Sequence, residues 1–302
     1  MRMASKRSYP RFKRDESTVV ALERLTATQV LKAESLVKSL VPQEQVVHGV
    51  RLAFKFLRAM LRLSREALGP AFVRRENARL RKAALSLSLW RDEKVVRDTL
   101  TELGDEMSEL SHAAVEDALR QWQQKTRPQH RHHKSLPVTL REALAALRTF
   151  QRNLDKAAWA APGWEAVSKG MKKSYRKAHH SLQLAEAAGI DELFHDARKR
   201  VKDLYYHVSL VEPALPKDSA RLEKRLLKLQ ALLGNDHDLS VAREVMSHAN
   251  SPEAAALKAL RKRSVQLRRK IGQRADKVFC AETKSCLNKT RRRLKKWPVT
   301  TG

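Results

Sequence analysis

Residues 48–63 read HGVRLAFKFLRAMLRL, and this stretch decides the fold. At about 100° per residue, a helix places the basic side chains of this stretch in one stripe roughly 80° wide. The stripe consists of His48, Arg51, Lys55, Arg58 and Arg62. Apolar residues fill both flanks, whereas an ordinary surface helix has a wide polar face and one apolar stripe. The pattern predicts a helix that packs against neighbours on two sides and exposes a cationic ridge to a groove or channel.

The rest of the chain favours an all-α fold with long helices and short connections. The 302 residues include only 9 glycines and 10 prolines, too few for the frequent turns of an all-β protein. Hydrophobic residues make up 42% of the chain, enough for a sizeable core. Apolar periodicity predicts helices at 17–40, 42–68, 71–89, 93–103, 105–125, 138–160, 164–187, 190–211, 216–233, 239–248 and 252–278. Residues 127–137 read as a loop rich in His and Pro.

Three blocks of sequence recur in the same order. His48–Leu57 resembles His195–Leu204 at an offset of 147 residues, and the blocks beginning at Arg75 and Leu87 resemble blocks 146 residues later. Either a unit of about 140 residues is duplicated, or amphipathic helices resemble one another by chance. We expect a basic disordered arm at 1–14, a first helical bundle at 15–134 and a second at 135–302, whose basic end near residue 296 frays.

Basic stripes like that of residues 48–62 occur at helical spacing elsewhere. They are Arg75, Arg79 and Lys82; Lys169, Lys173, Arg176 and His180; His195, Arg198 and Lys202; and Arg221, Arg225 and Lys228. We expect no acid at i±4 to neutralise these stripes, so their like charges repel one another. The stripes are then either solvated faces with counterions or a surface for a ligand that supplies negative charge. The basic segment 258–296 has the same two interpretations.

The net charge of +29 points to an anionic partner. Aromatic residues are only 5% of the chain, which argues against binding single-stranded nucleic acid by stacking. Binding to a duplex backbone needs only basic groups and stays open. A phosphohydrolase would need a cluster of carboxylates for Mg²⁺, and the stripes contain none.

Several motifs together resemble one family. They are His-x-x-Arg-x-x-x-Lys-x-Leu-Arg at His48–Arg58, its second copy at His195, the element Leu87–Val95 with Arg91, the run Gly170–Lys177, and Leu226–Gly234. In order and spacing they resemble the CHAD family, the conserved histidine α-helical domain. The resemblance implies two bundles related by pseudo-twofold symmetry around a basic channel. It also implies binding of inorganic polyphosphate, often at granules, without catalysis, by the stripe residues and Arg91.

The resemblance is incomplete in the second copy, where Asp203 and Tyr205 stand at positions that are usually basic in the family. His48 and His195 have four interpretations: metal ligand, nucleophile, phosphate donor or structural residue. The neighbouring cations favour phosphate contact over a metal. We expect Asp92 and Asp238 to be helix N-caps or to orient nearby arginines.

The overall expectation is a non-enzymatic polyphosphate-binding protein without metal or cofactor. The alternative is a nucleic-acid-binding protein that grips phosphates without reading bases, through the exposed segments 1–14 and 258–296. The N-terminal residues include no apolar secretory segment and the chain has only two cysteines, which favours the cytoplasm. We expect no membrane partner, and the sequence leaves the oligomeric state open.

Overall fold

The computed structural model describes residues 10–87, 89–106, 112–130, 134–216, 220–248 and 254–297. Within these ranges the chain is helical without a β-strand, which confirms the all-α class. The elements are α1 (Thr18–Lys38), α2 (Gln43–Leu63), α3 (Arg65–Leu68), α4 (Pro70–Ser86), α5 (Leu89–Glu106), α6 (His112–His130), α7 (Leu136–Asp155), α8 (Trp164–Ala188), α9 (Asp191–Leu210), the 3-10 turn η1 (Glu212–Ala214), α10 (Ala220–Met246), α11 (Ala254–Val278) and α12 (Ala281–Leu294). None of the described helices is long and apolar enough to cross a membrane.

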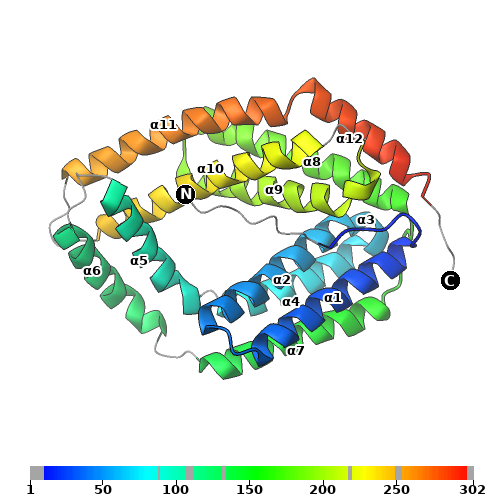
Figure 1. Ribbon diagram of the computed structural model, residues 1–302, viewed down its shortest axis with the longest axis horizontal. Helices are drawn as coiled ribbons and strands as arrows, with labels where there is room; N and C mark the ends of the chain where they lie inside the picture. The colour runs from blue at the N-terminus through cyan, green and yellow to red at the C-terminus, as the bar shows by residue number, and fades with distance from the viewer. Residues whose placement is uncertain are drawn as a thin grey trace.

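The helices form two main groups (Figure 1). In the first, α2 packs against α1 and α4, and α7 packs against the same two helices. In the second, α9 lies between α8 and α10, α11 runs along α10, and α12 packs on α8. Helix α2 fits this arrangement because apolar residues on both sides of its stripe are buried, including Phe54, Phe56 and Leu57, as predicted for residues 48–63.

Helices α5 and α6 join the two groups at one end of the molecule (Figure 1). They pack on α10 and share a second apolar core with α10 and α11, separate from the main core. Buried members of this second core include Leu100, Leu119, Leu239 and Leu260. Helix α7, by contrast, packs in the first group although it follows residue 134. The helix contacts therefore cross the boundary expected between residues 134 and 135.

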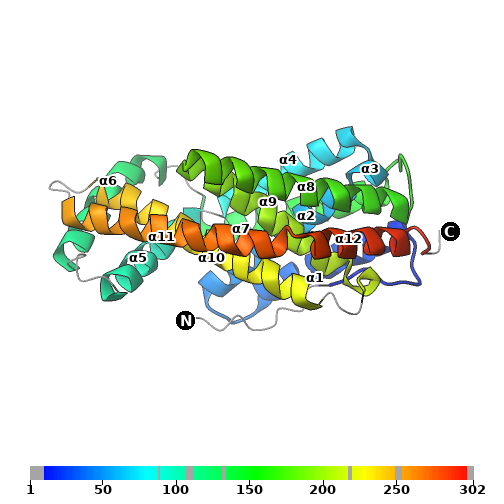
Figure 2. The same cartoon turned by 90° about the horizontal axis from the view of Figure 1, so that it is seen from above.

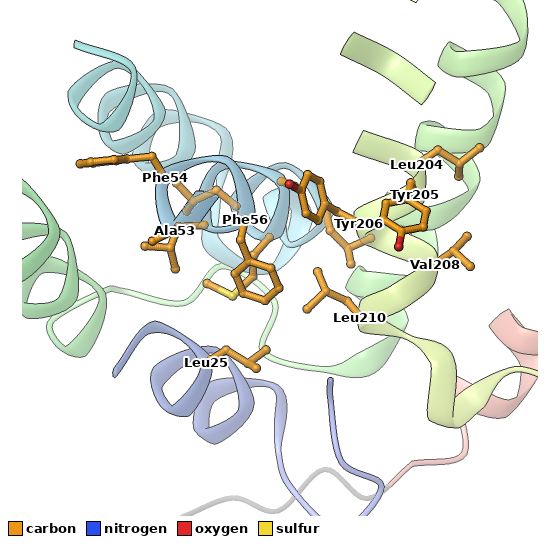
Figure 3. Close-up of a cluster of buried hydrophobic side chains, with 14 of the residues drawn as sticks. Leu25, Ala53, Phe54, Phe56, Leu204, Tyr205, Tyr206, Val208 and Leu210 are labelled. Atoms are coloured by element: carbon orange, nitrogen blue, oxygen red, sulfur yellow. The ribbon is translucent and has the colours of Figure 1, made fainter. Parts of the chain in front are cut away.

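The two groups meet where α2 crosses α9. The rings of Phe56 and Tyr206 meet edge to face at a centroid distance of 6.3 Å, among other buried apolar side chains (Figure 3). The buried His207 joins three helices, with Nε2 2.8 Å from the carbonyl oxygen of Ala59 and Nδ1 2.8 Å from the hydroxyl of Ser174. Because a carbonyl only accepts, Nε2 carries the hydrogen and Nδ1 accepts from Ser174. Burial lowers the pKa of His207 to about 4, so this link is made by a neutral ring.

Residues 10–14 are packed against the fold, so the expected disordered arm was wrong for this part of it. Phe12 is 1% exposed, and its backbone N–H donates to the carbonyl of Leu210 at 3.0 Å. Its ring meets Trp164 edge to face at 5.0 Å. The expectation of a frayed basic end was also wrong up to Trp297, which is 6% exposed and packs on Trp164 at 4.8 Å. An aromatic cluster thus fixes both described ends.

Two other local predictions differ from the structure. Helix α10 is continuous across residues 233–239, so Asp238 lies inside a helix and is not an N-cap. Helix α6 continues to His130 and α7 begins at Leu136, so residues 127–130 and 136–137 of the expected loop are helical. In α10, the polar residues 235–238 interrupt the apolar pattern without ending the helix, because its contacts with α9 and α11 are enough to maintain it.

Candidate functional site

The predicted stripe on α2 lies along α4, and α4 orients its arginines. All five stripe residues are half-buried. Arg58 Nε and Arg62 Nη1 both donate to the side-chain oxygen of Asn77, at 3.0 and 3.1 Å. Near the N-terminal end of the stripe, one turn after His48, Arg51 Nη1 donates to the carbonyl of Leu87 at 3.3 Å. These bonds fix the guanidinium groups in place.

At the C-terminal half of the stripe, cations from five helices gather around Arg62. Arg62 Nη2 pairs with Asp203 of α9 at 2.5 Å. We define the Arg62 cluster as the cations that act electrostatically on one another around this pair: Arg58, Arg62, Arg65, Arg81, Lys173, Lys177 and Arg200. Its inner members, Arg58 and Arg62, are half-buried, and the other five are exposed. Contacts of α2 and α3 with α8, and of α2 with α9, bring these helices together.

The electrostatics of the cluster show an excess of positive charge. Burial lowers the pKa of Arg58 to about 10, and the charges of Arg62 and Arg81 contribute in the same direction. Burial also lowers the pKa of Lys177, assisted by Arg200 and other cations of the cluster. Asp203 acts oppositely in both cases but does not compensate. An anion bound among these side chains would therefore be stabilised by groups that otherwise repel one another.

The second predicted stripe, on α9, faces α10. The Nδ1 atoms of His195 and His237 are 3.2 Å apart, so one ring donates a hydrogen and the other must be unprotonated at that atom. Burial, with the charges of Lys199 and Arg198, lowers the pKa of His195, and burial lowers that of His237 to about 4. Lys202 is half-buried on the same helix.

Arg198 is half-buried on this stripe, and burial lowers its pKa while the charge of Asp238 raises it. Asp238 therefore fits the second of its two predicted roles, that of a partner for a nearby arginine. Asp92 and Arg91 belong to α5, but their side chains lie outside the described residues.

Acidic residues neutralise parts of the stripes, contrary to expectation. On α4, the fully buried Glu76 pairs with Arg75 at 2.9 Å and Arg79 at 3.3 Å, and Asn153 of α7 donates to it as well. These arginines thus lie on the α7 side of α4, opposite the side on which Asn77 meets α2. On α8, Glu165 lies 3.7 Å from Lys169 at i,i+4 spacing, which the pattern analysis overlooked.

The remaining stripe residues are dispersed. Lys173 belongs to the Arg62 cluster and also lies 3.8 Å from Glu66 of α3. Arg225 donates to the carbonyl of Lys277 and pairs with Glu282 at 3.5 Å, linking α10 to α11 and α12. The other members are exposed on three helices: Lys82, Arg176, His180, Arg221 and Lys228.

Sequence reasoning missed Asn77, Arg65, Arg81, Lys177 and Arg200, which complete the cluster. A weak signal existed, because Asn77 and Arg81 have i,i+4 spacing on α4, as do Lys173 and Lys177 on α8. No sequence pattern could show that these faces converge on Arg62, since the convergence depends on how α8 and α9 cross α2.

No group of three or more His, Cys, Asp or Glu side chains in the described ranges could hold a metal ion. A cleft of about 640 Å³ lies between α5, α10 and α11 and is lined by Glu102, Asp238, Lys262 and others. It is lined by neither the residues of the Arg62 cluster nor those of the α2 stripe. The cluster is an open array of side chains, suited to an extended ligand more than to a small enclosed one.

Comparison with known proteins agrees with these observations. No curated protein matches the chain. A family model described as the CHAD domain matches residues 22–247, which include α2, α4, α8, α9 and every residue of the Arg62 cluster. Since this match covers most of the 302 residues, the resemblance inferred from the motifs is confirmed, and the chain belongs to the CHAD domain family.

Proposed function

We propose that this protein binds inorganic polyphosphate at the Arg62 cluster without converting it chemically. The excess of cations in the cluster carries the proposal: seven cationic side chains stand against the carboxylates of Asp203 and Glu66. Burial lowers the pKa of Arg58 and Lys177, and the neighbouring cations lower it further, an effect that a bound polyanion would oppose. Membership of the CHAD family supports this choice of polyanion.

The chemistry of the cluster suits phosphate oxygens. Polyphosphate carries negative charge on each phosphoryl unit and offers only oxygen acceptors, so its best partners are groups that donate without accepting. Arginine supplies a planar fork that pairs with two oxygens, and lysine supplies a mobile point charge. The side-chain oxygen of Asn77 accepts hydrogen bonds from both Arg58 and Arg62. These bonds orient the remaining N–H donors of the two guanidinium groups before polyphosphate binds.

The pseudo-symmetric arrangement around a basic channel is part of this proposal. Arg51 of the first copy donates a hydrogen bond to the carbonyl of Leu87. In the second copy, the charge of Asp238 acts on Arg198 and raises its pKa. Repeat-related arginines thus lie against repeat-related segments, which supports duplication. We expect the second stripe to bind phosphate more weakly than the first. Its His195 lies beside His237, and Asp203 on the same helix pairs with Arg62. The granule location that the family implies belongs to the same proposal.

Charge reversal at exposed members of the cluster tests the proposal. The cluster variant carries Arg81→Glu, Lys177→Glu and Arg200→Glu. The control variant carries Lys32→Glu, Lys38→Glu and Arg141→Glu, at exposed positions of α1 and α7. Both change net charge equally, so long-range attraction falls alike in each. Polyphosphate affinity, measured by calorimetry, should fall at least about 100-fold in the cluster variant, because charge-assisted hydrogen bonds are lost. Equal losses in the two variants would contradict a defined site.

A further inference from the structure

Helices α11 and α12 carry a second basic surface that the Arg62 cluster does not use. Both helices lie after residue 247, where the family match ends. Residues 254–297 contain 16 Lys and Arg but only two acids, Asp276 and Glu282. Figure 2 shows α11 and α12 running end to end along the length of the molecule. Figure 1 shows that α12 turns at an angle from the end of α11. At about 1.5 Å per residue, the 25 residues of α11 extend for roughly 38 Å and the 14 residues of α12 for roughly 21 Å.

Some of these cations attach the helices to the rest of the fold. Arg268 Nε pairs with the buried Asp236 at 3.0 Å, and its guanidinium stacks over Phe194 at 4.2 Å. Arg293 donates to the carbonyl of Leu215 at 2.7 Å, and Lys295 pairs with Glu165 at 3.0 Å. These contacts hold both helices rigidly, so the cations on the outer side occupy defined positions along one edge.

Ten other cations of these helices are exposed to solvent, and two of them, Lys262 and Lys270, also line the cleft between α5, α10 and α11. Their side chains are exposed and form no ion pair or hydrogen bond within the described part of the chain: Lys258, Arg261, Lys262, Arg269, Lys270, Lys277, Lys284, Lys289, Arg292 and Lys296. We call them the α11–α12 ridge. Keeping so many like charges on one edge disfavours the free protein by mutual repulsion. A ligand with closely spaced negative charges would remove this cost.

From these observations we infer that the α11–α12 ridge binds double-stranded nucleic acid through its phosphate backbone. A duplex carries a negative charge about every 1.7 Å of its axis. Its persistence length of about 500 Å far exceeds the ridge, so it pays almost no conformational entropy to lie along it. A flexible single-stranded polyanion would lose conformational entropy when it is extended along the ridge, and the exposed surface would contact only one side of it. The stiff ligand therefore fits the ridge, whereas a flexible chain fits a cluster that reaches it from several helices.

The composition of the ridge makes this binding independent of base sequence. Seven of its ten cations are lysines, which act as mobile point charges and do not supply the paired donors that read guanine. A membrane surface is the less suitable polyanion, because insertion needs apolar side chains beside the charges. On the described parts of α11 and α12, the only large hydrophobic side chain that is exposed is Val265.

The test uses the full chain and a fluorescent DNA duplex of about 30 base pairs, long enough to span the ridge. The ridge variant carries Lys258→Glu, Arg269→Glu and Lys277→Glu, at exposed positions of α11 that do not line the cleft. The control is again Lys32→Glu, Lys38→Glu and Arg141→Glu, with the same change in net charge. Fluorescence anisotropy gives duplex affinity at several salt concentrations, and calorimetry gives polyphosphate affinity for the same preparations. Circular dichroism establishes that all variants are equally helical.

The ridge variant should bind the duplex at least about 30-fold more weakly than the control, with a salt slope smaller than that of the native protein by about 3. Its polyphosphate affinity should match that of the control. The cluster variant should bind the duplex as the control does, which separates this inference from the proposed function. Equal duplex affinity in ridge and control variants would overturn it. So would a loss of polyphosphate affinity as large as the loss of duplex affinity, or a ridge that is needed for anionic vesicles but not for the duplex.

Discussion

Gly170 determines how closely α8 approaches the end of α2. A Cβ atom placed on Gly170 would lie 1.9 Å from the carbonyl oxygen of Leu63 and 3.0 Å from its carbonyl carbon. Both atoms belong to the backbone, so they cannot rotate away. A tolerable contact of about 3.2 Å therefore requires α8 and α2 to separate by more than about 1 Å, in a core packed to crystal-like density. Gly170→Ala is the smallest substitution that perturbs this approach.

The expected cost follows from two opposing effects. Alanine in a helix interior is favoured over glycine by up to about 1 kcal/mol. Overpacking against rigid neighbours costs about 1–3 kcal/mol and more when backbone must move, so Gly170→Ala should lower the free energy of unfolding by about 2 kcal/mol. The matched control is Gly234→Ala in α10, where a Cβ would meet nothing within 4 Å. That variant should gain about 0.5–1 kcal/mol from helix propensity alone.

Urea unfolding followed by circular dichroism measures both variants. Because Arg62 precedes Leu63 and Lys173 lies one turn after Gly170, the same displacement widens the Arg62 cluster. We therefore expect weaker polyphosphate binding by folded Gly170→Ala protein and unchanged binding by Gly234→Ala protein. If Gly170→Ala is as stable as the native protein and binds equally well, the close approach of α8 and α2 is not what positions the cluster.

Three further predictions concern the ends, the histidines and the ligand. Phe12→Ala should destabilise the fold by about 3–5 kcal/mol in urea unfolding, because a buried aromatic ring is lost, and a cost near zero would show that residues 10–14 do not belong to the core. The pKa of His207 is about 4 in the fold against 6.5 ordinarily, and that of His237 is also about 4, so the unfolded chain binds more protons between these values. Stability should therefore fall as pH decreases from 6.5 towards 4, and a flat profile of unfolding midpoints would contradict the buried neutral rings. The logarithm of polyphosphate affinity should fall with the logarithm of salt concentration with a slope of about −4 to −5 if most of the seven cluster cations contact phosphates, whereas a slope near zero would exclude an electrostatic site.

The α2 stripe could be predicted from sequence because its information is local. A period of 3.6 residues fixes which side chains share a face, and two apolar flanks imply neighbours on both sides. The structure places all five stripe residues on one half-buried face of α2, as the spacing requires. The CHAD resemblance was available for the same reason, since its motifs consist of short segments with fixed spacing.

The rest depended on distant contacts that no local pattern encodes. Arg75 and Arg79 have the same spacing as the α2 stripe, yet they pair with the buried Glu76 of α4, which also accepts a hydrogen bond from Asn153 of α7. Lys177 and Arg200 belong to the Arg62 cluster only because α8 and α9 cross α2. The basic neighbours of Phe12 predict a disordered arm, but its buried ring, packed edge to face on Trp164, outweighs that composition.

The most direct test of the central claim is the ionisation of Lys177 with and without polyphosphate. Lysine labelled with ¹³C at Cε reports the pKa of each amine by nuclear magnetic resonance, and Lys177→Arg identifies the signal. In the free protein, burial and the neighbouring cations should hold the pKa of Lys177 below its usual value of 10.5. Saturating polyphosphate should raise it, because the bound negative charge favours the protonated amine. A pKa of Lys177 that stays unchanged while polyphosphate binds would mean that the polymer does not bind at the Arg62 cluster.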